Sequence, residues 1–249
     1  MPDDKTGAMV ASSSSAAPVF ADAPLGLLAH APNELRGRHC HDTAYVAIIL
    51  EGGYQEAGDE GRFDVGPGDA LIHHAFESHL DRVEARGARV LILDLPPTLA
   101  RTPHVRGRVR DPEALGRVAS RDAADAAALL VEDFAVAPVA AHDWPDLLAH
   151  DLRTFAPFAL RDWAETHGVR AETLSRGFRT AYGCTPKAYR ADIRARAALA
   201  AIRAGPEPLA AIAHRLHFTD QAHMTRAVAR ISGVTPGRWR EHQLDTIRR

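Results

Sequence analysis

The sequence has little cysteine and no long apolar run. Only two of its 249 residues are cysteines, Cys40 and Cys184, and they are far apart in the chain. A disulfide framework or a cysteine-based zinc ribbon needs paired cysteines, so the sequence excludes both and suits a reducing cytoplasm. No apolar stretch approaches the roughly twenty residues that cross a bilayer, and the N-terminus lacks the order of a signal peptide, positive and then apolar. We therefore expect a cytoplasmic protein with no membrane partner.

Charge is divided unevenly along the chain. Residues 151–249 contain 17 Lys and Arg against 9 Asp and Glu, whereas residues 1–150 contain 13 against 23. The near-neutral total, formally −2, hides a basic half and an acidic half. Such a division is typical of a DNA-binding module tethered to a domain that does not bind DNA. The length and the 46% hydrophobic content allow two modest domains, and we predict two.

The basic half contains two copies of a pattern that predicts a helix, a tight turn and a second helix. In the first copy, a helix over residues 158–167 ends at Gly168, and a second helix covers residues 171–182. This second helix places Leu174, Phe178 and Tyr182 on one buried face and leaves arginines and small polar residues outside. The arrangement is typical of a helix that enters the major groove of DNA.

The second copy repeats this arrangement. A helix begins at Pro208, and a second one over residues 219–231 buries Met224, Val228 and Ile231. Between the copies, residues 185–202 predict one long helix, with Thr185 as its N-cap. Such a rod would fix the two outer faces relative to each other, at a spacing near one turn of DNA, about 34 Å.

These segments resemble the AraC/XylS family of bacterial transcription regulators. The resemblance is carried by Leu174-Ser175-Arg176-Gly177-Phe178, by Gly183-Cys184-Thr185-Pro186, by Ile193-Arg194-Ala195-Arg196-Ala197, by residues 218–226 and by Gly233-Val234-Thr235-Pro236-Gly237-Arg238-Trp239-Arg240. It implies two helix-turn-helix motifs in one unit beside a promoter, with double-stranded DNA and RNA polymerase as partners. The base-reading positions that it implies are Glu172, Ser175, Arg176, Gln221, Ala222, Thr225 and Arg226. Phosphate contacts are expected from Arg179, Arg190, Arg194 and Arg230.

The second motif departs from the family pattern at its turn. His217 stands where the family usually has glycine, so we expect a bulky residue in the left-handed region, at a cost of about 1 kcal/mol. Met224 and Val228 replace larger apolar residues, and Arg170 replaces the usual serine cap in the first motif. These departures affect how the second motif is seated on DNA, but not its existence.

The acidic half has the pattern of a β-sandwich or barrel. Short apolar or alternating runs at residues 45–50, 62–65, 70–74 and 90–95 are separated by Gly, Pro and Asp, and the first run is expected to end at Glu51-Gly52-Gly53. His39-Cys40-His41, Tyr45, Gly52, Gly68, His74 and His79 resemble the two motifs of the cupin barrel. The resemblance implies metal ligands at His39, His41 and His79, and puts Tyr45 at the carboxylate position. His74 and Phe76 replace the usual proline and glycine.

Three interpretations of these histidines stay open. His39 and His41 alternate on one strand and share a face, so with His79 they could hold zinc, nickel or iron. They could equally bind a small organic effector without metal, or have a structural role. His73 and His74 must face opposite ways, and Glu51, Glu56 and Glu77 are expected to be exposed, with Glu77 near enough to His79 to orient it.

The predicted class is α+β, a cupin-like barrel or sandwich followed by an all-α domain in which a long helix joins two helix-turn-helix motifs. The predicted divisions are a disordered tail at 1–19, a sensor domain at 20–97, a connector at 98–141 and a DNA-binding domain at 142–249. Within the connector, a helix over residues 122–134 would make a homodimer contact or only cover its own barrel.

The function predicted from these patterns is a sequence-specific transcription regulator that senses a small effector or a metal ion. It would not be an enzyme. The alternative is a metal-dependent cupin enzyme, an oxygenase or an isomerase, which suits the histidines but not the repeated arginine-bearing motif.

Overall fold

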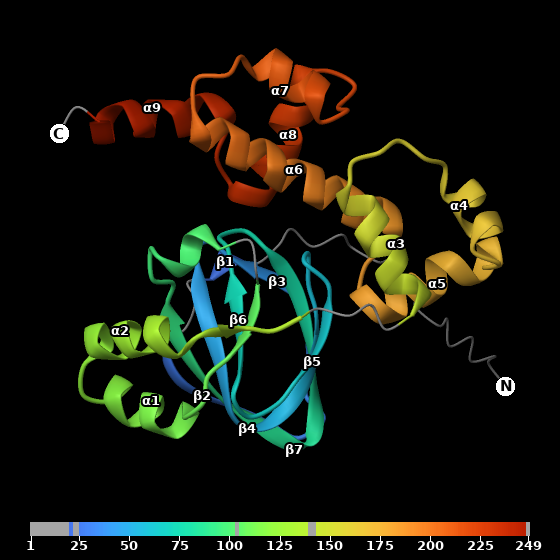
Figure 1. The fold of residues 1–249 in the computed structure, drawn as a ribbon. Helices are drawn as coiled ribbons and strands as arrows, with labels where there is room; N and C mark the ends of the chain where they lie inside the picture. The colour runs from blue at the N-terminus through green and yellow to red at the C-terminus, as the bar shows by residue number, and fades with distance from the viewer. Residues whose placement is uncertain (1–19, 22–24, 103–104, 139–142, 248–249) are drawn as a thin grey trace, which may run out of the picture.

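The computed structural model describes residues 20–21, 25–102, 105–138 and 143–247. A β-rich part comes first, followed by a helical part that arches over one end of it (Figure 1). This order confirms the predicted α+β class. The tail predicted at 1–19 lies outside the described residues. None of the helices in the described part of the chain is long and apolar enough to cross a membrane.

The strands of the β-rich part close around an apolar interior. Within the described residues one sheet has the strand order β1-β3-β7-β4-β6-β8-β9, with β2 paired to β7 and β5 to β4. Its strands are β1 (Phe20–Ala21), β2 (Gly26–His30), β3 (Leu35–His41), β4 (Tyr45–Ala57), β5 (Arg62–Val65), β6 (Asp69–His73), β7 (Ser78–Asp94), β8 (Arg106–Arg108) and β9 (Ala135–Val136). The interior core includes Ala47, Ile49, Phe63, Leu71 and Val90.

The expected end of the first long strand at Glu51-Gly52-Gly53 is wrong, because β4 continues to Ala57. Gly52 has a φ of 66° and lies at a register shift between β4 and β7. A Cβ atom on Gly52 would lie 1.9 Å from the Gly87 carbonyl oxygen, so only glycine permits this close approach. The glycine therefore forms a bulge where a turn was expected, and the strand beyond it returns to the barrel wall.

The segment predicted as a connector also contributes to the barrel. Strand β8 pairs with β6, and β9 pairs with β8. A short 3-10 helix η1 (Leu99–Arg101), helix α1 (Pro112–Ala119) and helix α2 (Ala123–Asp133) lie in the same segment. Leu115, Ala126 and Leu130 of the two α-helices are fully buried against the outer face of the sheet. Helix α2 thus covers its own barrel (Figure 1).

The helical part follows the predicted order of two motifs joined by a long helix. Its helices are α3 (Trp144–Arg153), α4 (Leu160–Thr166), α5 (Ala171–Tyr182), α6 (Pro186–Ala204), α7 (Leu209–Arg215), α8 (Gln221–Ser232) and α9 (Pro236–Ile247). Thr185 caps α6 as expected, its hydroxyl accepting the Ala188 N–H at 3.1 Å. His217 has a φ of 57°, which confirms a bulky residue in the left-handed turn position.

Each motif has its own apolar core, and the barrel contributes to both. The core of the first motif contains Phe178, Tyr182 and Tyr189, and it also takes up Ala57 and Leu80 of the barrel. The core of the second motif contains Met224, Val228 and Ile231, together with Phe76 from the loop between β6 and β7. The two parts of the chain are therefore packed against each other at this end of the barrel.

Candidate DNA-binding face and metal site

The outer face of α5 presents the residues predicted to read bases. Leu174, Phe178 and Tyr182 are buried, so the opposite side of the helix faces solvent. The three positions predicted to read bases, Glu172, Ser175 and Arg176, are all exposed, and so is Arg179, which is predicted to contact phosphate.

The outer face of α8 is similar. Met224, Val228 and Ile231 are buried, and of the predicted residues Gln221, Ala222, Arg226 and Arg230 are exposed while Thr225 is half-buried. The side chain of Asp220 accepts the His223 N–H at 2.6 Å and caps the start of the helix.

Two of the arginines expected at phosphates have partners within the protein. Arg230 lies 2.5 Å from the Asp192 carboxylate of α6. Arg190 donates to the Phe158 carbonyl at 3.2 Å, and its guanidinium lies over the Phe158 ring. A phosphate at Arg230 would share this guanidinium with the Asp192 carboxylate or displace the carboxylate.

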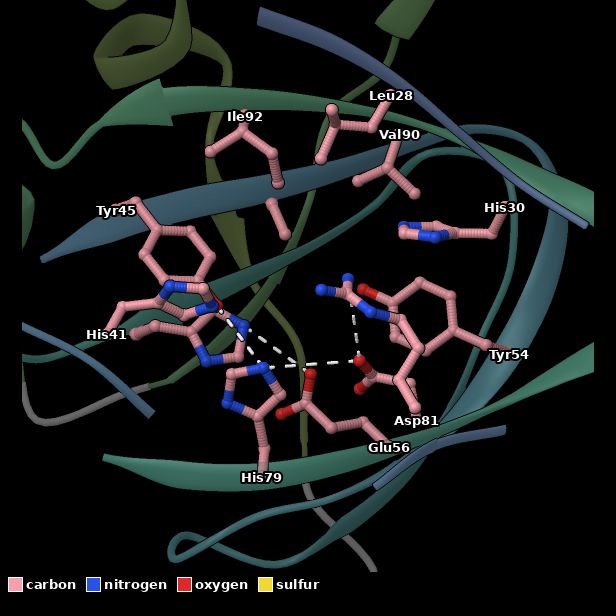
Figure 2. A pocket seen from close by; sticks show the side chains of 13 residues that line it. Leu28, His30, His41, Tyr45, Tyr54, Glu56, His79, Asp81, Val90 and Ile92 are labelled. Carbon is pink, nitrogen blue, oxygen red and sulfur yellow. Dashed lines mark hydrogen bonds and ion pairs between the residues drawn. The ribbon is translucent and has the colours of Figure 1, made fainter. Parts of the chain in front are cut away.

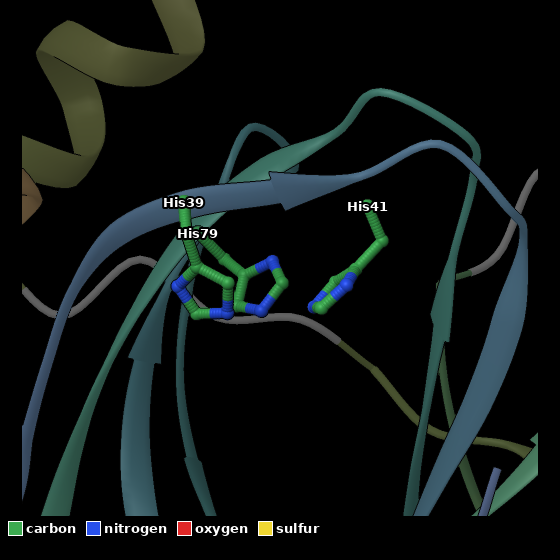
Figure 3. A group of neighbouring side chains, drawn as sticks. All are labelled: His39, His41 and His79. Atoms are coloured by element: carbon green, nitrogen blue, oxygen red, sulfur yellow. The ribbon is translucent and has the colours of Figure 1, made fainter. Parts of the chain in front are cut away.

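The three histidines of the cupin-like motif meet at the end of the barrel that faces the helical part (Figure 3). His39 and His41 come from β3, and His79 comes from β7, where it is the direct cross-strand partner of His39. The ring centroids of His39 and His79 are 4.3 Å apart, and those of His39 and His41 are 5.1 Å apart. One ligand atom from each of the three lies within 4.8 Å of the others, which suits a shared metal ion.

A second group shares His79 with the first. Glu56 of β4 and His73 of β6 lie close to His79, again with one ligand atom from each within 4.8 Å of the others. The Glu56 carboxylate is 3.4 Å from Nε2 of His73. All three residues are buried. Glu56 and His79 are labelled in Figure 2. The cluster thus offers four imidazoles and one carboxylate.

Tyr45 lies beside the histidines, but its chemistry differs from that of the carboxylate expected there. Its hydroxyl is 3.4 Å from Nε2 of His79, and its ring stacks on His73 with a centroid distance of 4.5 Å. Burial raises the pKa of Tyr45 well above its ordinary value, so the phenol stays neutral. Tyr45 can orient His79, while the carboxylate of the cluster comes from Glu56.

Burial keeps His39, His73 and His79 neutral. The pKa of His39 is lowered to about 4, chiefly by burial, and that of His73 is lowered to about 3, by burial and then by the neighbouring histidines. The pKa of His79 is also lowered well below its ordinary value, first by burial and then by His73. Neutral imidazoles have the lone pairs that a metal ion requires.

The carboxyl groups of Glu56 and of the neighbouring Asp81 are affected in the opposite direction, because their pKa values are raised. Burial raises the pKa of Glu56 well above its ordinary value, and the neighbouring Asp81 raises it further. The pKa of Asp81 rises to about 7, because burial outweighs the opposing effect of Arg36. A divalent cation would favour the ionised form of these groups and so compete with their protons.

Unpaired nitrogen atoms show that the cluster fits a metal ion. The nitrogen Nδ1 of His39 donates to the Gly37 carbonyl at 2.9 Å, which leaves its Nε2 with a lone pair. That Nε2 and the Nδ1 of His79 are buried and have no hydrogen-bond partner among the residues that the structure describes. Such buried groups cost about 1 to 3 kcal/mol each when unsatisfied. Zinc, nickel or iron would satisfy them.

The cavity at the cluster is small. It is lined by apolar residues at one side, among them Leu28, Val90 and Ile92 (Figure 2). The other side is lined by polar side chains that include His41, His73, His79, Glu56 and Asp81. Its volume is about 30 Å³. This volume has room for an ion with one or two waters, whereas organic ligands occupy pockets on the order of 300 Å³ or more.

Glu56 and His73 are not among the site residues predicted from the sequence. The expectation that Glu56 is exposed is wrong, because only 4% of its surface is accessible. Its position depends on the bulge at Gly52, and no local pattern indicated that the strand continued. The opposite orientation of His73 and His74 is confirmed, since His73 is buried and His74 is half-buried. Glu77 accepts the His74 N–H at 2.9 Å.

The fold and the site together define a class: a ligand-binding barrel joined to a double helix-turn-helix unit. Residues 23–155 match the family of AraC-like ligand binding domains, which is more than half of the chain. Residues 163–242 match the family described as a helix-turn-helix domain. The chain belongs to the AraC family of transcription regulators.

Individual relatives are distant. A putative AraC-like transcription regulator of Streptomyces lividans is 31% identical over 85 residues, which is 34% of this chain and 28% of that relative. The ToxT protein of Vibrio cholerae aligns over 86% of this chain and 96% of its own, with 7% identity and a TM-score of 0.39. A probable AraC family regulator of Rhodopseudomonas palustris aligns over 38% of this chain and 92% of its own, with 17% identity and a TM-score of 0.35.

Proposed function

We propose that this chain is a sequence-specific DNA-binding regulator whose barrel binds a divalent metal ion, and that occupancy of the metal site changes promoter binding. The observation that carries the metal part is the buried group of neutral imidazoles with two unpaired nitrogens. Membership of the AraC family supports the DNA-binding part of the proposal. RNA polymerase and a second copy of the chain are further partners that the resemblance implies.

The DNA-binding part is supported by charge and exposure. The half of the chain from residue 151 has a net charge of +8, and Arg176 and Arg226 lie on the exposed faces of α5 and α8. Guanidinium groups at such positions can bind guanine edges in the major groove, where each base pair has a distinct donor and acceptor pattern. Neighbouring arginines neutralise phosphates without reading sequence.

The size of the cavity favours a metal ion over an organic effector. A volume of about 30 Å³ beside His41, His73 and His79 leaves no room for a sugar or an aromatic acid. The small volume also disfavours a cupin oxygenase or isomerase, because such an enzyme must hold its substrate beside the metal. We therefore propose that the chain has no catalytic activity.

A structural path connects the metal site to the first motif. On β3, His39 and His41 point inward, and the adjacent residues Arg38 and Cys40 point outward because residues alternate along a strand. Outward-pointing Arg38 pairs with Asp59 at 2.6 Å and donates to the Tyr182 carbonyl of α5 at 3.4 Å. A shift of β3 on metal binding would reach α5 through this side chain.

Strand β7 repeats this pattern. His79 and Asp81 point inward, while Arg82 points outward and donates to the Thr180 and Ala181 carbonyls, the second at 3.1 Å. These carbonyls belong to the last turn of α5, where backbone acceptors lack helical partners and cations are favoured. The barrel thus holds the C-terminal end of the first predicted recognition helix.

Metal binding and DNA binding measured on the same preparations test the proposal. We expect the wild-type chain to bind zinc at one equivalent, and His79→Ala to lose it while keeping the DNA affinity of the metal-free wild type. His150→Ala, at an exposed position on α3, is the matched control and should behave as wild type. A wild-type chain that binds no zinc, nickel or iron contradicts the metal part, and turnover of a substrate that depends on His79 contradicts the absence of catalysis.

A further inference from the structure

Phe76 adopts a backbone conformation that suits glycine. It lies in the loop between β6 and β7, with a φ of 66°. An aromatic residue is rarely found in this region, because its Cβ atom crowds the backbone. The position is also the one at which the cupin-like motif normally has glycine. Such strain persists only where other contacts hold the residue in place.

The contacts that hold Phe76 come from the helical part. The residue is 5% exposed, and its ring is buried in the core of the second motif with Ala195, Leu199 and Met224. The ring of Trp239 on α9 meets it edge to face, with a centroid distance of 6.0 Å. A side chain of the barrel is thus part of the core of another domain.

The backbone of Phe76 joins the histidine cluster to the long helix. Its N–H donates to the His41 carbonyl at 2.7 Å. Its own carbonyl accepts from Arg196 of α6 at 3.3 Å. Arg196 also lies 2.6 Å from the Asp59 carboxylate of the barrel and donates to the Ser78 hydroxyl at 3.2 Å. One loop residue therefore contacts a candidate metal ligand on one side and the helical part on the other.

We propose that Phe76 is a latch that couples metal occupancy of the histidine cluster to the position of the second helix-turn-helix motif. The proposal rests on the proposed function and assigns its regulation to a residue. Phe76 is a positioning residue: it touches neither metal nor DNA.

The physical basis is that the loop between β6 and β7 is connected to two of the candidate metal ligands. His41 is hydrogen-bonded to the Phe76 backbone, and His79 follows three positions later in the chain. A metal ion that draws these two histidines together restrains the loop between them. Backbone strain at Phe76 opposes the docking of its ring. The loop therefore has two states: in one the ring is docked and the backbone is strained, and in the other the ring is undocked and the backbone is relaxed. The metal ion changes the populations of these two states.

The test compares Phe76→Gly with wild type in two measurements: the zinc affinity and the ratio of DNA dissociation constants without and with zinc. Glycine removes the ring and relaxes the backbone, so the variant should stay undocked. We expect the wild-type ratio to differ from unity at least fivefold, in the range of known coupling energies. In Phe76→Gly the ratio should fall to within twofold of unity, while zinc affinity stays within a few-fold of wild type.

Two further variants separate strain from docking. Asn33→Gly relaxes another left-handed residue of the barrel, with a φ of 57°, away from the latch, and should keep the wild-type ratio. Phe76→Leu keeps an apolar side chain and should retain an intermediate ratio, and it serves as the test if Phe76→Gly does not fold.

The outcomes distinguish the latch from the proposed function. Zinc binding with an unchanged ratio in Phe76→Gly and Phe76→Leu overturns the latch and leaves the metal-binding regulator in place. A wild-type chain that binds no metal overturns the proposed function and the latch together. A structural role for the ring alone predicts lower stability in Phe76→Gly with the ratio of wild type, which also overturns the latch.

Discussion

The two helix-turn-helix motifs have the same architecture but different weak points. The first turn contains Gly168, with a φ of 66°, whereas the second contains His217 in nearly the same conformation. The second recognition helix has Asp220 as a side-chain cap, whereas Arg170 at the start of the first makes no capping hydrogen bond within the described residues. The first motif therefore has the more favourable turn residue, and the second motif has the more favourable N-cap on its recognition helix.

The cores of the two motifs differ as well. In the first, Phe178 stacks on Tyr182 with a centroid distance of 4.7 Å and meets Tyr189 edge to face at 5.4 Å. The second core has aliphatic side chains such as Met224 and Val228 at its centre, together with the aromatic rings of Phe76 and Phe218. The barrel contacts α5 of the first motif through arginines that donate to backbone carbonyls. It contacts the second motif through the ring of Phe76. From this comparison we predict that the first motif is more rigid than the second.

The largest expected effect is on the two cores. Phe178→Ala removes a fully buried ring from the aromatic cluster and should lower the free energy of unfolding by about 3 to 5 kcal/mol. Met224→Ala should cost about 2 kcal/mol, the lower end for such a change, because a flexible neighbourhood relaxes around the cavity. Urea unfolding measures both. A greater loss in Met224→Ala would contradict the ranking of the two motifs.

The next effect concerns base reading. Arg176→Ala in the first motif and Arg226→Ala in the second should each lower discrimination between specific and random duplex by about 1 to 3 kcal/mol. Competition binding at fixed salt measures this difference. Arg161→Ala removes an exposed arginine from α4 and is the control, with no expected loss of discrimination. Equal losses on both duplexes in Arg176→Ala would show that this side chain contacts phosphate only.

A smaller effect concerns the missing cap. Arg170→Ser should raise the free energy of unfolding by about 1 kcal/mol, because the serine hydroxyl can accept an unpaired N–H in the first turn of α5. The reciprocal change, Asp220→Ala, should lower it by about the same amount in the second motif. Thermal unfolding of the two variants checks the pair. A gain in Asp220→Ala would be incompatible with the capping bond at His223.

The smallest effect is at the left-handed turn residues. His217→Gly relieves strain of about 1 kcal/mol, but glycine makes the unfolded chain more flexible, so we expect a net gain below about 1 kcal/mol. Gly168→Ala in the first motif should instead lose about 1 kcal/mol, since its backbone is also left-handed. Differential scanning calorimetry distinguishes the two signs. A loss in His217→Gly or a gain in Gly168→Ala would mean that the turns are not equivalent.

Much of the helical part could be predicted from the sequence because its information is local. Leu174, Phe178 and Tyr182 recur at helical spacing, and glycines mark the ends of helices, so both motifs followed from periodicity. The same holds for His39 and His41, whose alternation on one strand placed them on one face.

The rest depends on contacts between distant segments. Glu56 reaches the histidines only because β4 bulges at Gly52, where the Gly87 backbone approaches. Strands β8 and β9 are too short for a period to be recognised. The role of Phe76 depends on a core more than a hundred residues further along the chain, and its sequence signal was only the replacement of a usual glycine.

The most direct test of the central claim is a nuclease footprint of the purified chain on DNA upstream of its own coding sequence, with and without zinc. The account predicts two protected stretches about one helical turn apart, roughly 10 base pairs, whose protection changes when zinc is added. Protection that ignores sequence, or that is identical at all zinc concentrations while the metal is bound, would contradict it.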